Sequence, residues 1–520
     1  MINPSLPTEL IIEILHFVDI QSLLMCRLAC KDWNEIIQSD VSLVYKQELA
    51  VANMEDGNTD MSVVERLHLL REHQDAWEKH EFTDDTVINM HPLPHLAWDL
   101  QGGVLSQQTT LRSLTFYQIP SRLRGIRSRM WSMDDLDIPF ADFGLDPSQD
   151  LLVLAESPKL DDDPYVDHVK SPSVLINHNS NIHKIHLRTL MNGVTHPLAS
   201  NSILQYGSSY PHHHHNIRVF GDYLAVCWKH SLLVIWDWMS GRIQLVVTGS
   251  LVTFAFLPNN FLLIPRQQEE DIIAINLKLT QVEVDTPTSL SDIHYHCAFK
   301  LPPLASGYTI HHLEMRYDSQ PSAKTVTVPF RTMHDGDRVI LLDVGMINKG
   351  FAVAARFFLR GLGIIRHITA ISPSPRSTAR VHVLPWDIWG PQNFFPTRRN
   401  YCFIGTAVFP RNVHATNYVE LEFQAAHSEG HRSVISVIDL NQMKCRKSSV
   451  GPDFQSVRGL QFQVHGFQFP IITFLKCKRQ TLTLEREGRE FYRAILISED
   501  AIIVAYYSSE NTTQFRVMSI

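Results

Sequence analysis

The sequence predicts an α+β protein with helices and strands segregated along the chain: a three-helix module, linker helices, then a large all-β, propeller-like domain. Apolar residues recur at helical spacing in the N-terminal part, whereas from Ser113 onward short β-prone runs alternate with turn residues. A chain of 520 residues also exceeds what one hydrophobic core usually serves. We therefore expect a helical module over residues 1–45, a helical linker over 46–110 and a β domain over 111–520.

The N-terminal module is predicted to contain three short helices. Pro7 suits the first turn of a helix, and Glu9 places negative charge at its positive end. Asp19 is the expected N-cap of the second helix. A unit this small has more apolar side chains than it can bury alone, so we expect it to bind a partner. The apolar residues that define the helices are Leu10, Ile11, Ile14, Leu15 and Val18, then Leu23, Leu24 and Cys26, then Cys30, Trp33, Ile36 and Ile37.

Two more helices are predicted in the linker. Ser39 or Asp40 can cap a segment that runs through Leu49. Ser62, followed three residues later by Glu65, forms the pattern of a capping box. Apolar residues of that second helix share one face, so we expect it to pack against the module or the start of the β domain.

The β domain is best defined between Ile217 and Thr248. Four β-prone runs, separated by turn residues, predict a four-stranded antiparallel meander there. Many short strands in meanders of about 30 to 50 residues favour a propeller over a single sandwich. The other runs are Leu251–Phe256, Phe261–Pro265, Asp271–Leu277, Val339–Val344, Val434–Leu440, Ile471–Leu475 and Ala501–Tyr507. We expect the last strands, up to Ser519, to pair with or lie beside the first strands after Ser113, and so to complete a blade and close the ring.

The N-terminal module resembles an F-box. Residues 6–9 match its Leu-Pro-x-Glu start, apolar pairs follow in the first two helices, and residues 30–33 match its Cys-Lys-x-Trp end. The resemblance implies a surface that binds a Skp1-like adaptor and, through it, a cullin. The residues expected in this adaptor-facing apolar patch are Leu6, Pro7, Ile14, Leu15 and Leu23.

The resemblance extends into the β domain. Segments 146–154, 221–226 and 235–241 are similar to parts of a divergent set of F-box proteins from mushroom-forming fungi. These segments are turn-and-strand patterns, and they identify no ligand.

Composition and charge narrow the possible partners. The chain has 54 acidic and 46 basic residues and a formal net charge of -8, which argues against non-specific binding to nucleic acid or an anionic membrane. It has no apolar run long enough to span a bilayer, and Glu9 and Glu13 do not fit a secretory signal. Seven scattered cysteines suit a reducing compartment. We expect a cytoplasmic or nuclear protein, with neither nucleic acid nor membrane as a partner.

Two features could bind metal, but a simpler interpretation is favoured for each. Cys26 and Cys30 have helical i, i+4 spacing, yet no second pair of suitable spacing lies nearby, so we interpret them as small buried hydrophobes. The run His212–His215 could chelate a transition metal, but consecutive histidines in a loop rarely converge on one ion. No metal or cofactor is therefore predicted.

Two further features could bind protein ligands or define a repeat. Arg122, Arg124, Arg127 and Arg129 could hold a phosphorylated motif, but a solvated sheet edge with protective charges is favoured. Trp236-Asp237 resembles the dipeptide of one propeller family, yet only this segment carries it. We therefore interpret Trp236 and Trp238 as packing residues.

The sequence carries no recognised catalytic motif, and we expect no catalytic residue and no enzyme activity. The leading hypothesis is a non-catalytic substrate-recognition subunit of an SCF-type (Skp1-cullin-F-box) E3 ubiquitin ligase, whose β domain captures a protein target. The alternatives are an interaction scaffold without ligase coupling and a β-propeller hydrolase.

Overall fold

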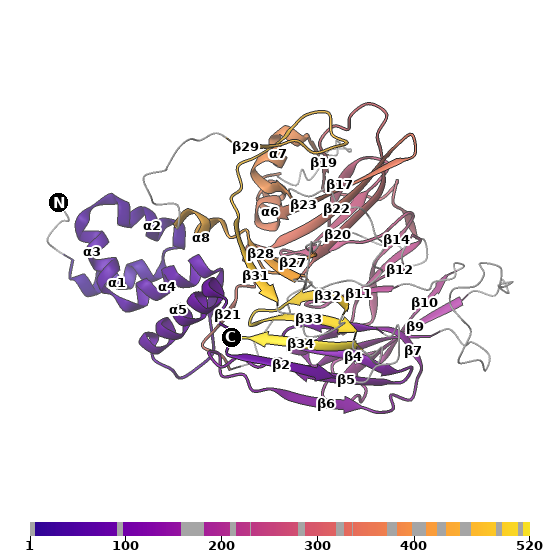
Figure 1. Ribbon diagram of the computed structural model, residues 1–520, viewed down its shortest axis with the longest axis horizontal. Coiled ribbons are helices and arrows are strands. Elements are labelled where there is room, and N and C mark those ends of the chain that lie inside the picture. Colours follow the sequence, from indigo (N-terminus) through magenta and orange to yellow (C-terminus); the bar gives the residue numbers. More distant parts are fainter. Residues whose placement is uncertain are drawn as a thin grey trace, which may run out of the picture.

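The computed structural model describes fourteen ranges of the chain: residues 6–90, 97–157, 181–208, 215–228, 230–278, 287–318, 327–334, 336–371, 382–397, 412–423, 433–447, 459–484, 491–507 and 513–520. The helices of the first eighty residues gather at one end of the molecule and the strands form a large domain beside them, which confirms the predicted fold class (Figure 1).

The N-terminal helices begin where their caps predict. The carboxylate of Asp19 accepts hydrogen bonds from the backbone N–H groups of Gln21 and Ser22, and that of Asp40 from Leu43. Ser62 and Glu65 form the predicted capping box. The helices are α1 (Thr8–Phe17), α2 (Ile20–Ala29), α3 (Lys31–Ser39), α4 (Val41–Ala52) and α5 (Val63–Lys79).

The β domain is a seven-bladed propeller, and each blade has four antiparallel strands. Blade 1 contains β3 (Trp98–Gln101), β4 (Val104–Thr110), β5 (Ser113–Gln118) and β6 (Arg129–Met133); blade 2 contains β7 (Phe140–Asp146), β8 (Leu151–Glu156), β9 (Asn181–Thr189) and β10 (Ile203–Ser208); blade 3 contains β11 (His215–Phe220), β12 (Tyr223–Trp228), β13 (Leu232–Asp237) and β14 (Arg242–Thr248). Blade 4 contains β15 (Ala255–Leu257), β16 (Phe261–Arg266), β17 (Asp271–Asn276) and β19 (Cys297–Lys300); blade 5 contains β20 (Thr309–Tyr317), β22 (Val339–Asn348), β23 (Phe351–Arg360) and β25 (Phe394–Pro396). Blade 6 contains β26 (Val413–His414), β27 (Asn417–Phe423), β28 (Ser433–Asp439) and β31 (Lys478–Leu484); blade 7 contains β32 (Phe491–Ile497), β33 (Ala501–Tyr507), β34 (Thr513–Ser519) and β2 (Asp84–Asn89).

Several shorter elements extend or connect the blades. β18 (Thr288–Ser289) and β24 (His382–Leu384) add a parallel fifth strand to blades 3 and 4. Two small sheets join β1 (Met54–Asp56) to β21 (Phe330–Thr332) and β29 (Leu460–Phe462) to β30 (Ile471–Thr473). The remaining helices are η1 (Pro147–Gln149), α6 (Gly361–Ala370), α7 (Trp386–Asn393) and α8 (Gln442–Lys447).

Blade 3 is the predicted four-stranded meander. Gly221 and Gly241 adopt positive φ angles of 56° and 73° at two of its turns, a conformation that glycine reaches without strain. Trp236 and Trp238 are buried, which confirms their predicted packing role.

The last blade joins the two ends of the β domain. β34 pairs along its length with β2, from Asp84 opposite Ser519 to Asn89 opposite Gln514. The prediction had these last strands pair with or lie beside the first strands after Ser113. The paired strand is β2, whereas Ile503 and Phe515 of blade 7 pack in one core cluster with Leu105 and Ile119 of blade 1. β2, β3 and β4 lie within the stretch predicted as a helical linker. Asp84, Asp85 and Thr86 of β2 are exposed and polar, so the strand lacks the apolar alternation that marks a half-buried strand.

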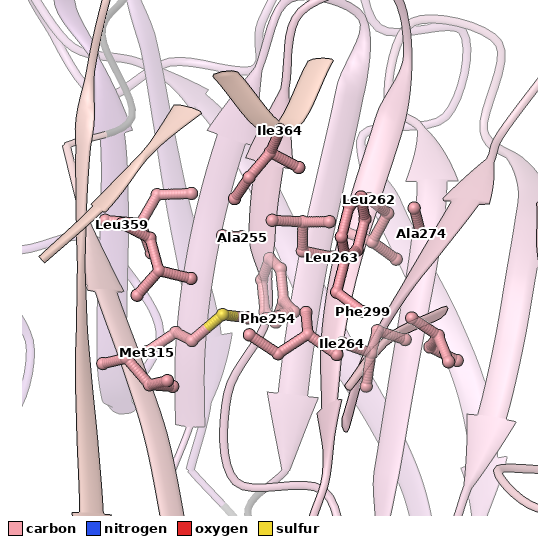
Figure 2. Close-up of a cluster of buried hydrophobic side chains, with 14 of the residues drawn as sticks. Phe254, Ala255, Leu262, Leu263, Ile264, Ala274, Phe299, Met315, Leu359 and Ile364 are labelled. Atoms are coloured by element: carbon pink, nitrogen blue, oxygen red, sulfur yellow. The ribbon is translucent and has the colours of Figure 1, made fainter. Parts of the chain in front are cut away.

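The largest core cluster spans blades 3 to 5. Figure 2 shows Leu263 of β16, Phe299 of β19, Met315 of β20 and Leu359 of β23 converging, with Ile364 of α6 above them. Phe254 lies among them although it precedes β15, so the predicted run Leu251–Phe256 is buried but only its end is a strand. The predicted run Ile471–Leu475 forms β30, which lies outside the blades.

Candidate functional site: an apolar surface on the first two helices

One face of α1 presents large apolar side chains to solvent. Leu10, Ile14 and Phe17 follow each other at i, i+4 and i+7, so they share one side of the helix. All three are exposed, and Phe17 has 88% of its surface accessible. Leu6 and Pro7, just before the helix, are also exposed, so the apolar strip continues past its N-terminus.

α2 adds two exposed apolar side chains. Met25 and Leu28, at i and i+3, are 67% and 80% accessible. The helix starts at Asp19, and hydrogen bonds from the hydroxyl and N–H of Ser22 lower the pKa of that carboxyl. The cap therefore remains ionised at neutral pH, and it fixes where α2 begins.

The structure divides the five predicted patch residues between surface and core. Leu6, Pro7 and Ile14 are exposed, whereas Leu15 and Leu23 are buried in the small core of the module. Leu15 lies on the opposite side of α1 from Leu10. Leu15 and Leu23 therefore support the exposed surface from the core of the module. That core consists of Ile11, Leu15, Leu23, Ile37 and Leu43.

Four exposed residues of this surface were absent from the prediction: Leu10, Phe17, Met25 and Leu28. The spacing of Leu10, Ile14 and Phe17 was a signal that could have identified two of them. We call Leu6, Pro7, Leu10, Ile14, Phe17, Met25 and Leu28 the exposed apolar surface of α1 and α2.

α4 holds the first two helices in place. The Lys46 ammonium donates to the carbonyls of His16 and Val18 at 2.7 and 2.6 Å, at the end of α1. Cations are favoured there because the C-terminus of a helix carries partial negative charge. The Arg27 guanidinium of α2 donates to the side-chain oxygen of Gln47 at 2.7 Å. Hydrogen bonds from α4 therefore hold both helices that carry the exposed apolar side chains.

The end of α4 is bonded to the propeller. Asn53 closes the helix in the left-handed conformation (φ 59°), and its side chain both donates to the Asp337 carbonyl at 2.8 Å and accepts from the Asp337 N–H at 2.9 Å. Beyond it, β1 pairs with β21, and Arg331 forms an ion pair with Glu55 at 2.6 Å. Asn441 also donates to the Val51 carbonyl at 2.8 Å. These bonds fix α4 to blades 5 and 6.

α5 is joined to the propeller by a buried charged cluster. The Arg124 guanidinium lies 2.6 Å from the Asp500 carboxylate and 2.8 Å from Glu499, while Ser121 donates to Asp500 at 2.9 Å. The His73 ring of α5 contacts the same carboxylate at 3.3 Å. Burial alone would raise the pKa of Asp500, but Arg124 and these hydrogen bonds lower it to about 2. Asp500 is therefore an anion that connects α5 to the propeller.

The cluster also corrects the interpretation of the arginine stretch. Arg124 is buried and ion-paired, so it belongs neither to a solvated edge nor to a free phosphate-binding group. Arg122, Arg127 and Arg129 are exposed, and the guanidinium of Arg129 lies over the Trp131 ring.

Neither feature that could bind metal forms a metal site in the described residues. Cys26 and Cys30 are free and half-buried. His212, His213 and His214 lie outside the described residues, and His215 begins β11. Among the residues that the structure describes, no three His, Cys, Asp or Glu side chains are grouped to hold a metal ion.

Residues 4–48 match the family model described as F-box-like. The match contains α1 to α3, most of α4 and the whole exposed apolar surface. The chain therefore carries an F-box-like domain followed by a seven-bladed propeller.

Similarity to solved structures is weak. Kluyveromyces lactis Hsv2 shares 10% identity over 51% of this chain and 67% of its own, with a TM-score of 0.25. The WD40 domain of SCAP from fission yeast shares 10% identity over 84% of this chain and 98% of its own, with a TM-score of 0.35. No curated protein matches the sequence. Within the described ranges, no helix is long and apolar enough to cross a membrane.

Proposed function

We propose that this protein is a non-catalytic substrate-recognition subunit of an SCF-type ubiquitin ligase. Its F-box-like domain binds a Skp1-like adaptor and, through it, a cullin, while its propeller holds a protein target. The supporting observation is that the segment matching the F-box-like model also carries the exposed apolar surface of α1 and α2. We also propose that the chain belongs to the divergent set of F-box proteins from mushroom-forming fungi, which segments of its propeller resemble.

The exposed apolar surface has the chemistry of an obligatory interface. Removing a large apolar side chain from water contributes about 1.5–3 kcal/mol, so Phe17 and Leu28 favour a bound state. Several large exposed apolar side chains on two helices of one small domain are typical of interaction sites. The adaptor would cover these residues, while Leu15 and Leu23 keep the helices correctly spaced.

The two binding functions require a fixed geometry. α4 and α5 are joined to the propeller by β1–β21 pairing, by the Asn53 bonds and by the Arg124 cluster. A target held by the propeller would therefore lie at a defined distance from an adaptor bound to α1 and α2. Such a fixed spacing suits transfer of ubiquitin by an enzyme assembled on the adaptor side.

The test is adaptor binding by surface variants. Phe17→Asp combined with Leu28→Asp should weaken binding of a purified Skp1-like adaptor by about a hundredfold or more, because the two most exposed apolar side chains of these helices would be replaced by unpaired charges. Isothermal titration calorimetry measures the affinity. Val64→Asp on α5 is the matched control, since Val64 is 62% exposed and lies outside the F-box-like segment.

Two results would contradict the proposal. One is undiminished adaptor affinity in a double variant whose melting curve matches the wild type. The other is wild-type protein that binds adaptor but recruits no cullin, which would instead support a scaffold without ligase coupling. In the proposed role the chain performs no chemistry itself and works in the cytoplasm, the nucleus or both, with neither nucleic acid nor membrane as a partner.

A further inference from the structure

The loop between β5 and β6 of blade 1 is fixed to the rest of the propeller. The buried Arg124 guanidinium lies 2.6 Å from the Asp500 carboxylate, and the Ser121 hydroxyl donates to the same carboxylate at 2.9 Å. Ser121 also forms a β-bridge with Ile126 across the loop. Because Asp500 contacts the His73 ring of α5 as well, the loop lies on the side of the propeller to which α5 is attached.

The other arginines of the loop carry positive charge that the described side chains do not neutralise. Within the described ranges none of them forms an ion pair, whereas Arg112 and Arg516, also at the surface, lie 2.8 and 2.6 Å from aspartates. Residues 119–133 contain no Asp or Glu. The exposed arginines are Arg122, Arg127 and Arg129.

Trp131 holds the Arg129 side chain in place. The Trp131 ring is stacked on Phe116 with centroids 5.1 Å apart, and its indole N–H donates to the Leu190 carbonyl at 3.2 Å. The Arg129 guanidinium lies over this ring, 5.3 Å from its centroid, and its Nη1 is 3.9 Å from the Met191 sulfur. A guanidinium stacked in this way keeps N–H groups at its rim for a carboxylate. Arg129 is therefore oriented before any ligand binds.

β6 is the outer strand of blade 1 and has an open edge. Among the described strands it pairs with β5 alone, and in Figure 1 it lies along the lower margin of the propeller. An extended segment of another chain can pair with such an edge. Side chains on one face of that segment repeat every second residue, about 6.6 Å apart. Arg127 and Arg129 are likewise two positions apart, so carboxylates at alternate positions would match their spacing.

The acidic residues that follow β6 limit the site to the start of the strand. Asp134 lies five residues beyond Arg129, about 16 Å along an extended strand. Salt screens exposed charges over roughly 8 Å at physiological ionic strength, so Asp134 does not neutralise Arg129. The next acidic residue, Asp135, is already paired with Arg112. The same screening limits the repulsion between an acidic ligand and the net charge of -8.

The placement of the arginines favours a run of carboxylates over a single phosphate. Several guanidinium groups around one point would suit one phosphate. Arg129 is instead held over Trp131, and Arg122 belongs to a separate turn, in which its carbonyl accepts from the Gly125 N–H at 3.3 Å. Exposed Arg, Trp and Met side chains are enriched at protein interfaces. The edge thus fits an acidic protein segment.

We infer that this edge binds an extended acidic segment of the target protein. The segment adds a strand beside the start of β6 and places Asp or Glu side chains, at alternate positions, against Arg127 and Arg129. This inference rests on the proposed role of the propeller as a substrate receptor. A target bound here lies on the side of the propeller to which α5 is attached. We call Arg122, Arg127, Arg129 and Trp131 the basic edge.

Peptide binding by the full-length protein tests the inference. The probe is a fluorescein-labelled peptide of alternating Glu and Val with blocked ends, and fluorescence anisotropy measures its affinity. Wild type should bind it, and more weakly as salt is added. Arg129→Glu should weaken binding at least about tenfold, because an attractive charge contact becomes a repulsive one. Arg129→Lys keeps the charge but loses the planar group over Trp131, so its affinity should lie between the two.

The matched control is Arg242→Glu in blade 3. Arg242 is exposed and begins the fourth strand of its blade, as Arg129 does, so the variant makes the same change of charge. Its strand, β14, already pairs on its second side with β18, so this variant should bind the peptide like wild type. Melting curves of all variants establish that they are folded.

Two further peptides separate charge from strand pairing. Replacing each Glu with Gln removes the negative charge, and replacing each Val with Pro removes every second backbone N–H. Both peptides should bind wild type much more weakly than the Glu/Val peptide does.

Several results would overturn the inference: no binding of the Glu/Val peptide by wild type, equal binding by wild type and Arg129→Glu, or equal binding of the Glu/Pro peptide. Binding of a Ser/Val peptide with one phosphoserine, without binding of the Glu/Val peptide, would assign the basic edge to a phosphorylated ligand. Flotation with phosphatidylserine vesicles that depends on Arg129 would assign it to lipid.

Adaptor titration of the same samples separates this inference from the proposed function. Arg129→Glu should retain adaptor binding, and Phe17→Asp/Leu28→Asp should retain peptide binding. Loss of adaptor binding alone would contradict the proposed function, and loss of peptide binding alone would contradict the role of the basic edge.

Discussion

The buried cluster between α5 and the propeller predicts a large, pH-dependent effect of a single substitution. Arg124→Met removes the guanidinium that contacts both Asp500 and Glu499 and donates to the Phe330 carbonyl at 3.2 Å. Asp500 would remain buried with its charge no longer balanced. Breaking a buried ion pair from one side costs about 3–5 kcal/mol, a large share of the stability of an ordinary domain.

The direction of the pH dependence follows from Asp500. In the wild type its pKa is about 2, below its ordinary value of 3.8, so it stabilises the folded state above pH 4 or so and loses that contribution as pH falls toward 2. Each unit by which the folded state lowers the pKa corresponds to about 1.4 kcal/mol, so the lowering from 3.8 to about 2 contributes roughly 2 kcal/mol to the free energy of unfolding. Without Arg124 the pKa of Asp500 should rise, since burial then dominates. The variant should therefore be most destabilised at neutral pH, and the difference from wild type should shrink in acid.

Urea denaturation of the full chain between about pH 4 and pH 8, followed by tryptophan fluorescence, measures the difference in unfolding free energy. Arg124→Met combined with Asp500→Asn should recover more than half of the loss, because the unpaired charge is gone. The reasoning is refuted if Arg124→Met is as stable as wild type at neutral pH, or if its destabilisation grows in acid.

Two further predictions concern the closure of the ring and a buried thiol. Deleting residues 513–520 removes β34, which leaves β2 and β33 without their shared partner, so the midpoint of urea unfolding should fall markedly. A soluble truncation with an unchanged midpoint would show that β34 is not needed for closure. Burial raises the pKa of Cys297 to about 12, so iodoacetamide followed by mass spectrometry should modify half-buried Cys30 in the native protein long before Cys297. Modification of both at equal rates would contradict the buried position of Cys297.

Local signals in the sequence identified the elements whose causes are themselves local. Asp19 and the pair Ser62–Glu65 start their helices through bonds to residues two or three positions away, so the caps could be predicted without knowledge of the fold. The strands of blade 3 were predicted for a similar reason. They are apolar runs separated by short turns, and consecutive runs pair with each other.

The division of the N-terminal module into surface and core required the tertiary structure. Ile14 and Leu15 are adjacent and equally apolar, yet one is exposed and the other is buried. Which of them faces the core depends on how α1 is rotated against α3 and α4, and the resemblance to an F-box did not specify that rotation. Phe17 and Leu28 were not included in the predicted patch for the same reason.

By itself, then, the sequence determined two segregated regions, an F-box-like start, the caps of its helices and the strands of its best-defined blade. Only the tertiary structure decided that polar β2 completes blade 7 with β34, and that Arg124 is buried against Asp500 rather than exposed beside Arg122. Each of these contacts joins residues more than three hundred positions apart. Such contacts depend on the free energy gained when segments distant in the sequence pack together. A local pattern of residue types therefore does not predict them.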